Sequence, residues 1–371
     1  MRVALLSYDF GEYCIRLASG LAANAEVLLL LPRQLAHTHL PKLDRRVRCC
    51  LFDKPRLRQP FRQLGTLHRL HREIRKFSPD VIHIQQGHLW FNFSLSFLPE
   101  VPKVFTIHDP MPHIGDRESR KTPQVVFDLG FRRGVQFIVH GQRLKEVVID
   151  RLPISAENIH VIPHIVIGDG AASAHVGEIG NTVLFFGRIW PYKGLEHLIR
   201  AEPLITARIP DARIVIAGQG EEFSRYRQMM IHPEHFVVHN SYISDERRAE
   251  LFREASIVVL PYIEATQSGV IPVAYAFAKP VVATSVGGLP EMVEHGCSGY
   301  LVPPGDERAL ADAIVRLLED DELRQVFGWN GKRKVDTECS PAVVARKTLT
   351  VYRRALGDSA AEPVAKGVGV P

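Results

Sequence analysis

The sequence of 371 residues contains no hydrophobic run that could span a membrane. Its apolar stretch Val27–Leu31 is far shorter than the roughly 20 residues that a membrane-spanning helix needs. The opening segment, MRVALLSYDF, has an apolar run that is too short for a signal peptide. We therefore expect a cytoplasmic protein without a transmembrane segment.

Cysteine is scarce, and the sequence shows no low-complexity tract and no internal repeat. The five cysteines are Cys14, Cys49, Cys50, Cys297 and Cys339. They have neither the paired spacing of a zinc site nor the regular spacing of a disulfide framework. We interpret them as reduced thiols, as is typical of a cytoplasmic protein.

The net charge of +5 is unevenly distributed. Residues 1–150 contain 23 Lys and Arg against 14 Asp and Glu, a net charge of +9, whereas the remainder carries 23 and 27, a net charge of −4. Twelve basic residues lie between Lys42 and Lys76, opposed only by Asp44, Asp53 and Glu73. Such a block attracts anionic lipid, nucleic acid or a phosphorylated substrate. Few aromatic residues interleave with it and no nucleic-acid-binding module is recognisable, so we expect no nucleic acid partner.

Part of this basic block has the pattern of an amphipathic helix. The predicted apolar face consists of Phe61, Leu64, Leu67, Ile74 and Phe77. We expect this face to pack on a sheet, as in an ordinary α/β domain. The arginines around it would draw the protein to anionic lipid as a peripheral protein on the inner face of the membrane.

Both halves of the sequence show short apolar segments separated by amphipathic helices. The apolar segments are 3–7, 26–31, 80–85, 103–109 and 136–141 in the first half, and 182–187, 213–218, 236–240, 256–261 and 280–284 in the second. Their continuous apolar character is typical of strands covered on both faces, as in parallel sheets. Strand–helix alternation, repeated twice, predicts two doubly wound α/β domains.

The boundary between the domains is expected between His164 and Asn181, where the sequence is rich in Gly, Ala and Ser and lacks periodicity. We assign residues 1–165 to the first domain and 166–340 to the second. A last helix is expected over 341–356, and the small-residue tail 357–371 is expected to be disordered.

Two basic residues follow the first strand of the second half. Arg188 and Lys193 stand five residues apart in GRIWPYKG, across a turn that contains Pro191. Ligands of open α/β sheets bind beyond the carboxyl ends of the strands, so both cations can converge there on one anion. An Arg fork suits phosphate oxygens and a Lys adds a mobile charge. A solvated pair at a loop tip is the alternative explanation.

A polar turn opens a helix after the segment 256–261. It reads YIEATQSG from Tyr262 to Gly269. Free backbone N–H groups and the positive end of the helix dipole predict a diphosphate site at such a turn. Thr266 and Ser268 could instead be simple N-caps.

Taken together, four motifs of the second half resemble the retaining glycosyltransferases of family 4. They are GRIWPYKGLEHLI, AGQGEE, FREASIVVLP and KPVVATSVGGLPEMVEHGCSGYLVPPGD. A looser resemblance continues through PDVIHIQ, FTIHDP, IVHGQRLKEVV and IHVIPH in the first half. It implies the GT-B fold: two Rossmann-like domains that face each other across a cleft, with a C-terminal helix that crosses back and packs on the first domain. It also implies that the first domain binds the acceptor and the second a nucleotide-diphospho-sugar donor.

The resemblance implies roles for individual residues. Arg188 and Lys193 match the basic pair that holds the donor diphosphate, and Gly11 matches the close-approach loop after the first strand. The turn that seats the phosphate and the sugar corresponds to Glu264, Thr266, Gln267, Ser268 and Gly269. The positions beside the nucleotide base and ribose correspond to Gln219, Gly220, Tyr242 and Ile243.

His108 in FTIHD matches the family's active-site histidine, with Asp109 beside it. A histidine merely hydrogen-bonded at a strand end is the alternative. Its place at the carboxyl end of a predicted parallel strand, next to a carboxylate, favours a functional role. We expect His108 and Asp109 to be catalytic.

The chain departs from the family at two glutamates, eight positions apart, that usually contact the donor sugar and the ribose. Counting back from Lys279 and Pro280 places them at Ala265 and Val273, with Glu264 one residue from the first. A related subgroup has a T-Q-S-G turn here, so we interpret the chain as a variant rather than a dead enzyme.

No Asp-x-Asp metal signature lies at a suitable strand end. We therefore expect no metal and no cofactor, with Arg188 and Lys193 stabilising the leaving diphosphate. The resemblance implies retention at the anomeric carbon. No residue is a convincing nucleophile for a covalent intermediate, so we expect front-face transfer to a saccharide, a lipid-linked saccharide or a polysaccharide precursor.

Three other functions remain open. A nucleotide-sugar epimerase or a sugar phosphorylase can have the same fold. A catalytically weak nucleotide-sugar-binding protein is favoured by the missing glutamates. The sequence does not identify the sugar, the nucleotide base or the acceptor.

Overall fold

The computed structural model describes residues 1–85, 88–110, 124–168 and 177–358. These residues fall into two compact units. Within the described ranges, the first unit comprises residues 1–110, 124–165 and 340–358, and the second comprises residues 166–339. Most of the tail expected to be disordered, residues 359–371, lies outside the described residues.

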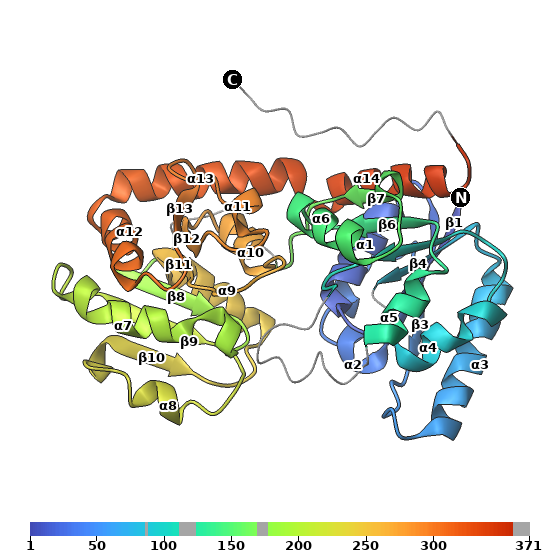
Figure 1. The fold of residues 1–371 in the computed structure, drawn as a ribbon, viewed down its shortest axis with the longest axis horizontal. Helices are drawn as coiled ribbons and strands as arrows, with labels where there is room; N and C mark the ends of the chain where they lie inside the picture. The colour runs from blue at the N-terminus through green and yellow to red at the C-terminus, as the bar shows by residue number, and fades with distance from the viewer. Residues whose placement is uncertain (86–87, 111–123, 169–176, 359–371) are drawn as a thin grey trace. The chain divides into compact units, whose positions relative to one another are not determined.

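A seven-stranded parallel sheet forms the centre of the first unit (Figure 1). The strand order is β3-β2-β1-β4-β5-β6-β7. The strands are β1 (Arg2–Ser7), β2 (Glu26–Pro32), β3 (Arg48–Phe52), β4 (Val81–Gln85), β5 (Lys103–Thr106), β6 (Gln136–Val139) and β7 (Ile159–Val161). Parallel neighbours need long crossovers. The helices of this unit are α1 (Gly11–Leu21), α2 (Arg33–Ala36), α3 (Pro60–Phe77), α4 (Leu89–Ser94), α5 (Gln124–Phe131), α6 (Gln142–Arg151) and α14 (Pro341–Ala355).

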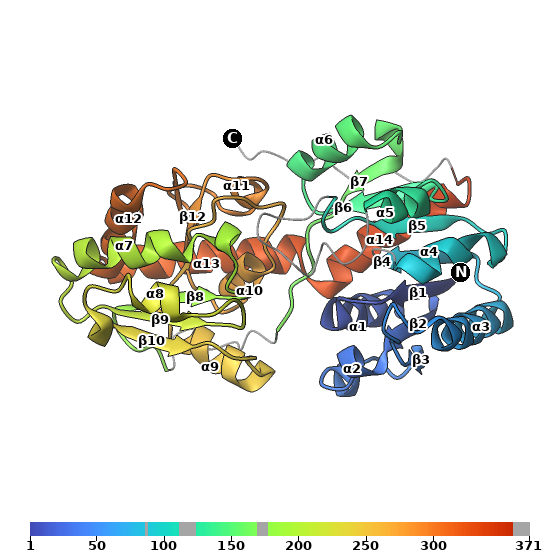
Figure 2. The same cartoon turned by 60° about the horizontal axis from the view of Figure 1, so that its bottom comes forward.

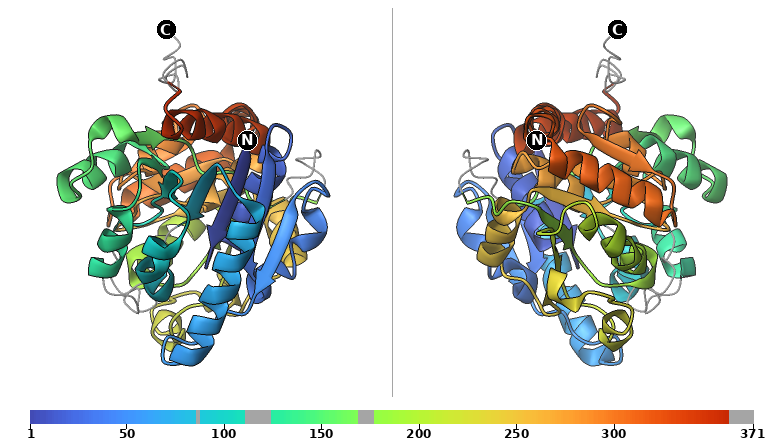
Figure 3. Two further views of the ribbon diagram at one scale, coloured as in Figure 1. Left: turned by 90° about the vertical axis from the view of Figure 1, so that its right-hand side faces the viewer. Right: turned by 90° about the vertical axis from the view of Figure 1, so that its left-hand side faces the viewer.

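Helix α3 covers β1, β2 and β3, as the left view of Figure 3 shows with the light-blue helix in front of the blue strands. Its buried apolar residues are Leu67, Leu70, Ile74 and Phe77. The predicted apolar face is wrong in its first turns, because Phe61 is 88% and Leu64 55% exposed. An 18-residue helix is about 27 Å long, whereas the five-residue strand β3 is only about 17 Å long, so the first turns of α3 extend past the sheet.

Helix α14 packs on α1 of the first unit. The carbonyl oxygen of Pro341 comes so close to Gly20 that a Cβ there would overlap it. The Tyr352 hydroxyl lies 2.6 Å from His83 Nδ1 in the core. The expected return of the last helix to the first domain is confirmed.

The second unit has a six-stranded parallel sheet of order β10-β9-β8-β11-β12-β13. Its strands are β8 (Thr182–Phe186), β9 (Arg213–Ala217), β10 (Phe236–His239), β11 (Ile257–Leu260), β12 (Val281–Thr284) and β13 (Gly299–Val302). Its helices are α7 (Leu195–Thr206), α8 (Ser224–Arg227), α9 (Asp245–Glu254), α10 (Val270–Ala276), α11 (Leu289–Met292), α12 (Glu307–Glu319) and α13 (Asp321–Glu338). Helices α7 and α12 pack side by side (Figure 2).

The prediction of two doubly wound domains is confirmed, but the sequence did not predict β3, β7 and β13. Strand β3 lies at the edge of its sheet and is partly exposed, so its sequence RCCLF has no continuous apolar run. Strand β7 has only three residues. The predicted strand 103–109 ends earlier, at Thr106, which leaves His108 in the loop after β5.

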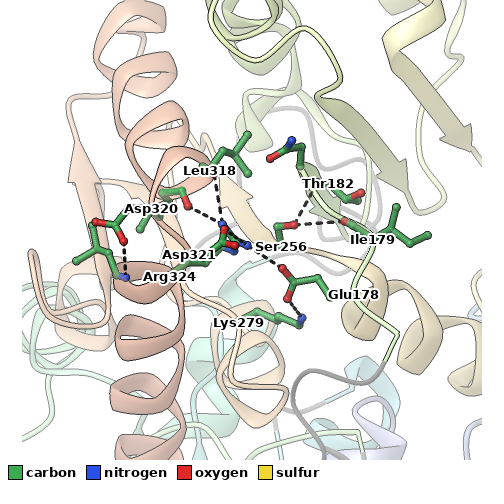
Figure 4. Close-up of polar contacts among 12 residues, drawn as sticks. Glu178, Ile179, Thr182, Ser256, Lys279, Leu318, Asp320, Asp321 and Arg324 are labelled. Carbon is green, nitrogen blue, oxygen red and sulfur yellow. Dashed lines mark hydrogen bonds and ion pairs between the residues drawn. The ribbon is translucent and has the colours of Figure 1, made fainter.

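A buried ionic cluster fixes the segment that leads into β8 (Figure 4). Glu178 accepts from Lys279 Nζ at 2.7 Å and lies 3.2 Å from Arg324 of α13. The Ser256 hydroxyl bonds the neighbouring backbone at Ile179 and Thr182. Burial lowers the pKa of Lys279, whereas Glu178 opposes this shift. Glu178 therefore joins three segments that are distant in the sequence.

None of the helices within the described residues combines the length and the apolar character that crossing a membrane would require.

Candidate functional site

Two loops of the second unit meet beyond the carboxyl ends of β8 and β11. The first contains Arg188 and Lys193, and the second runs from Tyr262 to Gly269. Gly194 has a φ of 63°, and a Cβ there would overlap the carbonyl oxygen of Pro261. A glycine is therefore required both by the left-handed backbone and by the close approach of the two loops.

Lys193 is tied directly to the second loop. Its Nζ donates to the Tyr262 hydroxyl at 2.5 Å and lies 4.1 Å from the centroid of the same ring. The hydroxyl oxygens of Tyr262 and Ser268 lie 3.3 Å apart. Burial raises the pKa of Tyr262, so the phenol is neutral and accepts from the ammonium. The structure thus brings Lys193 and the predicted turn together.

Arg188 is exposed at the end of β8. Its positive charge acts on Tyr262, where it opposes the rise in the pKa caused by burial. Lys193 therefore acts on Tyr262 by direct contact, and Arg188 acts on it through its charge.

Three buried nitrogen atoms around this edge have no hydrogen-bond partner among the described residues. They are Trp190 Nε1 after β8, His239 Nε2 at the end of β10 and Gln267 Nε2 in the turn after β11. An unpaired buried donor costs about 1–3 kcal/mol. Trp190 Nε1 and Gln267 Nε2 are donors, whereas His239 Nε2 is a donor or an acceptor according to its tautomer. Because unpaired buried polar atoms are rare in folded proteins, three at this sheet edge are what a site for a polar ligand would leave.

Some polar groups of the turn are already hydrogen-bonded within the protein. Ser268 Oγ accepts from the Val270 backbone N–H at 3.3 Å, but the N-cap of α10 is Gly269 and has no side-chain cap bond. The Thr266 carbonyl accepts from Gly288 N at 3.0 Å. Helix α10 begins directly after Gly269 and is only seven residues long. Gln267 is therefore the residue of this turn whose buried side-chain donor has no partner among the described residues.

The two positions at which family 4 usually has glutamates differ in their surroundings. Val273 is 2% exposed and lies in the apolar core between α10 and β11. A glutamate there would bring a carboxylate into this apolar core, and burying an unpaired charge is costly. Ala265 is half-buried and packs on the same core, while the neighbouring Glu264 is half-buried in the loop.

The residues predicted near the nucleotide base lie in the loops that follow β9 and β10. Gln219 and Gly220 pair with Ile189, and a Cβ at Gly220 would overlap the Ile189 carbonyl oxygen. Tyr242 is 72% exposed after β10, whereas Ile243 packs on the core. Gly220 is thus explained by contact between loops, and Gln219 and Tyr242 are the exposed members of this set.

The remaining predicted residues lie in the first unit. Gly11 begins α1, and a Cβ there would overlap the carbonyl oxygen of Leu35. The glycine therefore lets the start of α1 lie close to α2. Phe10 before it has a left-handed backbone with φ 58°. Such strain in a non-glycine residue is costly and often marks a functional site. The Phe10 ring stacks on His108 with centroids 3.8 Å apart.

His108 is buried in a chain of hydrogen bonds. Its Nε2 lies 2.9 Å from Gln85 Oε1, and its Nδ1 lies 3.1 Å from His140 Nε2. Gln85 Nε2 lies 3.0 Å from His83 Nε2. Burial lowers the pKa of His108 well below its usual value and that of His140 to about 3. These imidazoles are therefore neutral at pH 7.

Asp109 is half-buried and follows His108. Its negative charge raises the pKa values of His140 and His164, against the larger lowering by burial. The predicted pair His108 and Asp109 thus belongs to a larger histidine cluster.

Sequence reasoning missed Tyr262, Trp190, His140 and His164 as site residues. Tyr262 and Trp190 stand inside the motifs that were already identified, so their position was a usable signal. His140 and His164 each follow a strand of the first half, as His108 does. Only the neighbouring positions of β5, β6 and β7 in the sheet bring the three together.

Two family models match most of the chain. The one described as Glycosyltransferase Family 4 matches residues 11–167, and the one described as Glycosyl transferases group 1 matches residues 180–320. The first matched range ends close to the division between the units, and the second lies within the second unit.

Curated relatives match over part of their length. An uncharacterized glycosyltransferase of Methanocaldococcus jannaschii is 33% identical over 186 residues, which are 50% of this chain and 47% of that protein. A phosphatidyl-myo-inositol mannosyltransferase of Mycobacterium leprae is 34% identical over 180 residues, 47% of each chain. The chain spans about half the length of these curated relatives.

Solved structures match over nearly the whole chain at low identity. Sucrose-phosphate synthase from Thermosynechococcus elongatus gives a TM-score of 0.73 at 19% identity and covers 96% of this chain and 100% of that one. Anabaena HepE in complex with UDP-glucose gives a TM-score of 0.72 at 20% identity and covers 94% and 99% of the two chains. These likenesses establish the fold.

Proposed function

Since the chain belongs to the family 4, group 1 glycosyltransferases, we propose that it transfers a sugar from a nucleotide-diphospho-sugar to a hydroxyl group of an acceptor. The observation that carries this proposal is the direct bond from Lys193 to Tyr262, which lies against the Ser268 turn. A cation, a polar turn and unpaired buried donors at one sheet edge suit a polar anion such as a diphosphate.

We assign the donor diphosphate to Arg188 and Lys193. When the anomeric C–O bond breaks, negative charge grows on the leaving diphosphate, and cations fixed in advance stabilise that charge. The bond to Tyr262 holds the Lys193 ammonium in place, so little reorganisation is needed during the reaction. This role requires no metal ion at the diphosphate.

Gln267 is assigned to the phosphate or the donor sugar. Its Nε2 is buried and has no partner among the described residues, so a ligand oxygen would satisfy it. We assign the nucleotide to the edge near His239 Nε2 and the exposed Tyr242. Because solved relatives bind UDP or UDP-glucose, UDP-sugars are the first donors to test.

His108 and Asp109 are proposed to act on the transferred sugar, as the family resemblance implies. Both ring nitrogens of His108 are engaged, with Gln85 and with His140, so a sugar hydroxyl would have to replace one of these partners. The proposed outcome is retention by front-face transfer, in which the departing diphosphate accepts the acceptor's hydroxyl proton. The bond to the diphosphate breaks and the bond to the acceptor oxygen forms on the same face.

The acceptor is proposed to be a saccharide, a lipid-linked saccharide or a polysaccharide precursor, used in the cytoplasm. Helix α3 exposes Phe61 and Leu64 in its first turns, and its exposed basic residues are Arg62, Arg69, Arg72, Arg75 and Lys76. Apolar side chains next to cations suit the headgroup region of an anionic membrane. We propose that α3 attaches the protein to such a surface.

The donor assignment is tested by thermal unfolding with nucleoside diphosphates and nucleotide-sugars. A ligand that binds the folded protein raises the Tm, and the stabilisation grows with the logarithm of its concentration relative to its Kd. We expect a nucleoside diphosphate to stabilise the wild type, and Arg188→Gln and Lys193→Met to reduce this shift at the same ligand concentration. Arg200→Gln, on the exposed side of α7, is the matched control and should retain it. Equal shifts in all four proteins would contradict the assignment.

A catalytically weak nucleotide-sugar-binding protein is the second candidate. It is favoured by the buried Val273 and by Ala265, which replace two carboxylates of the family. Such a protein would show the same Tm shift with neither sugar transfer nor donor hydrolysis. Turnover of a bound donor by the wild type distinguishes the two functions.

A further inference from the structure

Three histidines gather at the carboxyl edge of the first unit's sheet. His108 follows β5, His140 follows β6 and His164 follows β7, and these three strands are neighbours. One ring nitrogen from each histidine lies within 4.8 Å of those of the other two. His108 and His140 are buried, and His164 is half-buried.

The opposite nitrogen of each ring is already used as a donor. His140 Nδ1 faces the carbonyl oxygen of Ile162 at 3.0 Å, and His164 Nδ1 faces that of Ile165 at 2.8 Å. A carbonyl oxygen only accepts, so both Nδ1 atoms carry the proton. The remaining lone pairs of these two neutral rings are therefore on Nε2.

The same reasoning applies to His108. Its Nε2 faces the amide oxygen of Gln85 at 2.9 Å, so this nitrogen donates and Nδ1 has the lone pair. His108 Nδ1 then meets the lone pair of His140 Nε2 at 3.1 Å. Unless one of the two rings changes its tautomer, this contact pairs two lone pairs that repel each other, and a cation bound by both nitrogens would remove the repulsion.

We propose that His108, His140 and His164 bind a divalent transition-metal ion, with Zn²⁺ as the best fit. Zn–N bonds of about 2.0–2.1 Å in tetrahedral geometry separate two ligand nitrogens by about 3.4 Å, near the observed 3.1 Å. Neutral imidazoles suit Zn²⁺, Co²⁺, Ni²⁺ and Cu²⁺ and disfavour Mg²⁺ and Ca²⁺. Three histidines leave a fourth coordination position for water or a hydroxyl group.

The surroundings have the features of a supported metal site. Metal-binding histidines usually donate their second N–H to a carbonyl or a carboxylate, as all three rings do here. Phe10 stacks on His108, and Tyr13 meets the rings of His108, His140 and His164 within 5.1–5.6 Å. These contacts fix the ring orientations before a metal binds.

This inference goes beyond the proposed function and revises the expectation that the chain has no metal site. It leaves the diphosphate to Arg188 and Lys193, in the other unit. A metal with one exchangeable position would bind a hydroxyl oxygen and make that hydroxyl a stronger acid. The first unit is where the family resemblance expects the acceptor.

The test uses the full chain, stripped with EDTA, dialysed and titrated with Co²⁺. We expect one Co²⁺ per chain, with the intense visible bands of four-coordinate cobalt, displaced by one Zn²⁺. His140→Gln and His164→Gln each remove one ligand and should weaken Co²⁺ binding at least 10-fold and abolish these bands. A rise in Tm with Zn²⁺ in the wild type, absent from both variants, is the second readout.

His160→Gln is the matched control. His160 is also buried, in β7, but its Nε2 bonds Gln136 and lies outside the cluster. This control should bind Co²⁺ as the wild type does. Equal Co²⁺ binding by the wild type, His140→Gln and His164→Gln would overturn the site, as would a wild type that binds no Co²⁺. The Gln85 amide would then be turned so that His108 Nδ1 donates to His140. Nucleoside diphosphate binding is measured on the same samples and tests the proposed function separately.

Discussion

Lys193 Nζ lies 2.5 Å from the hydroxyl oxygen of Tyr262 and 4.1 Å from the centroid of its ring. Lys193 is 8% exposed, so its ammonium depends on this contact for part of its stabilisation in the folded protein. The contact also fixes the position of the charge relative to the turn that ends at Gly269. Tyr262 is therefore a positioning residue for the proposed diphosphate site.

Tyr262→Phe should weaken nucleoside diphosphate binding about 5- to 10-fold, because it keeps the ring but removes the hydroxyl that locates Lys193. Lys193→Met should weaken binding about 10- to 100-fold, since a charged hydrogen bond is lost. Titration calorimetry measures both. Tyr275→Phe is the control, because its buried hydroxyl bonds Ser298 instead and its loss should leave the affinity unchanged. Unchanged affinity in Tyr262→Phe would disprove the positioning role.

Gln267→Leu should separate stability from binding. The variant removes a buried donor that has no partner among the described residues, so the free energy of unfolding should rise by about 1 kcal/mol. The same change should weaken nucleoside diphosphate or nucleotide-sugar binding about 10-fold. Urea unfolding and calorimetry give the two values. Gln325→Leu, at an exposed site on α13, controls for the added apolar side chain. A destabilised Gln267→Leu would show that Nε2 is already satisfied.

Helix α3 should bind vesicles of anionic phospholipid at low salt and release them at high salt. Changing Arg62, Arg69, Arg72 and Arg75 to Gln should abolish this binding, because each basic residue near the surface contributes about 1 kcal/mol. Phe61→Ser with Leu64→Ser should weaken it by loss of apolar burial. Vesicle co-sedimentation measures both effects.

A charge-matched control removes four exposed arginines from the second unit: Arg208, Arg227, Arg308 and Arg316. We expect this control to bind vesicles as the wild type does. A loss equal to that of the α3 variant would attribute binding to net charge rather than to α3. Nucleoside diphosphate affinity should be unaffected in all of these variants.

Glu178→Gln should destabilise the second unit by about 3 kcal/mol, because it leaves the Lys279 ammonium buried without its carboxylate. The double variant Glu178→Gln, Lys279→Met should be more stable than Glu178→Gln alone, since both charges are then removed. Urea unfolding midpoints give the comparison. Losses that simply add in the double variant would show that the pair is not coupled.

The protein should lose stability in weak acid through its buried histidines. Burial lowers the pKa of His88 and of His160 to about 4. The unfolded chain takes up these protons near pH 6.5, whereas the folded protein does not until about pH 4. Their contribution is therefore full above pH 6.5 and falls as the pH drops towards 4, by about 2 kcal/mol per histidine at pH 5.

Urea unfolding of metal-free protein between pH 7 and pH 5 measures this loss. His160→Gln should lose about 2 kcal/mol less than the wild type over the same range, because one of the protons is no longer involved. Carboxylates contribute equally to both proteins. Equal pH dependence in the two would show that His160 is protonated in the folded state.

Much of the fold was predictable because parallel strands covered on both faces leave continuous apolar runs in the sequence. The failures lie where burial is incomplete or the strand is short. Strand β3 is at an exposed edge and β7 has three residues. The exposed Phe61 and Leu64 show the same limit, since periodicity predicts an apolar face but not where the sheet beneath it ends.

The sequence by itself determined the two doubly wound domains, the basic pair Arg188 and Lys193, and the polar turn at Gln267. These follow from patterns that are local in the chain, because strand, turn and helix propensities act over a few residues. The tertiary structure alone decided that the Tyr262 hydroxyl meets Lys193. It also decided that β5, β6 and β7 lie side by side, which brings His108, His140 and His164 together. Such contacts depend on strand order and on ring orientation, and both are set by packing between segments that are distant in the chain.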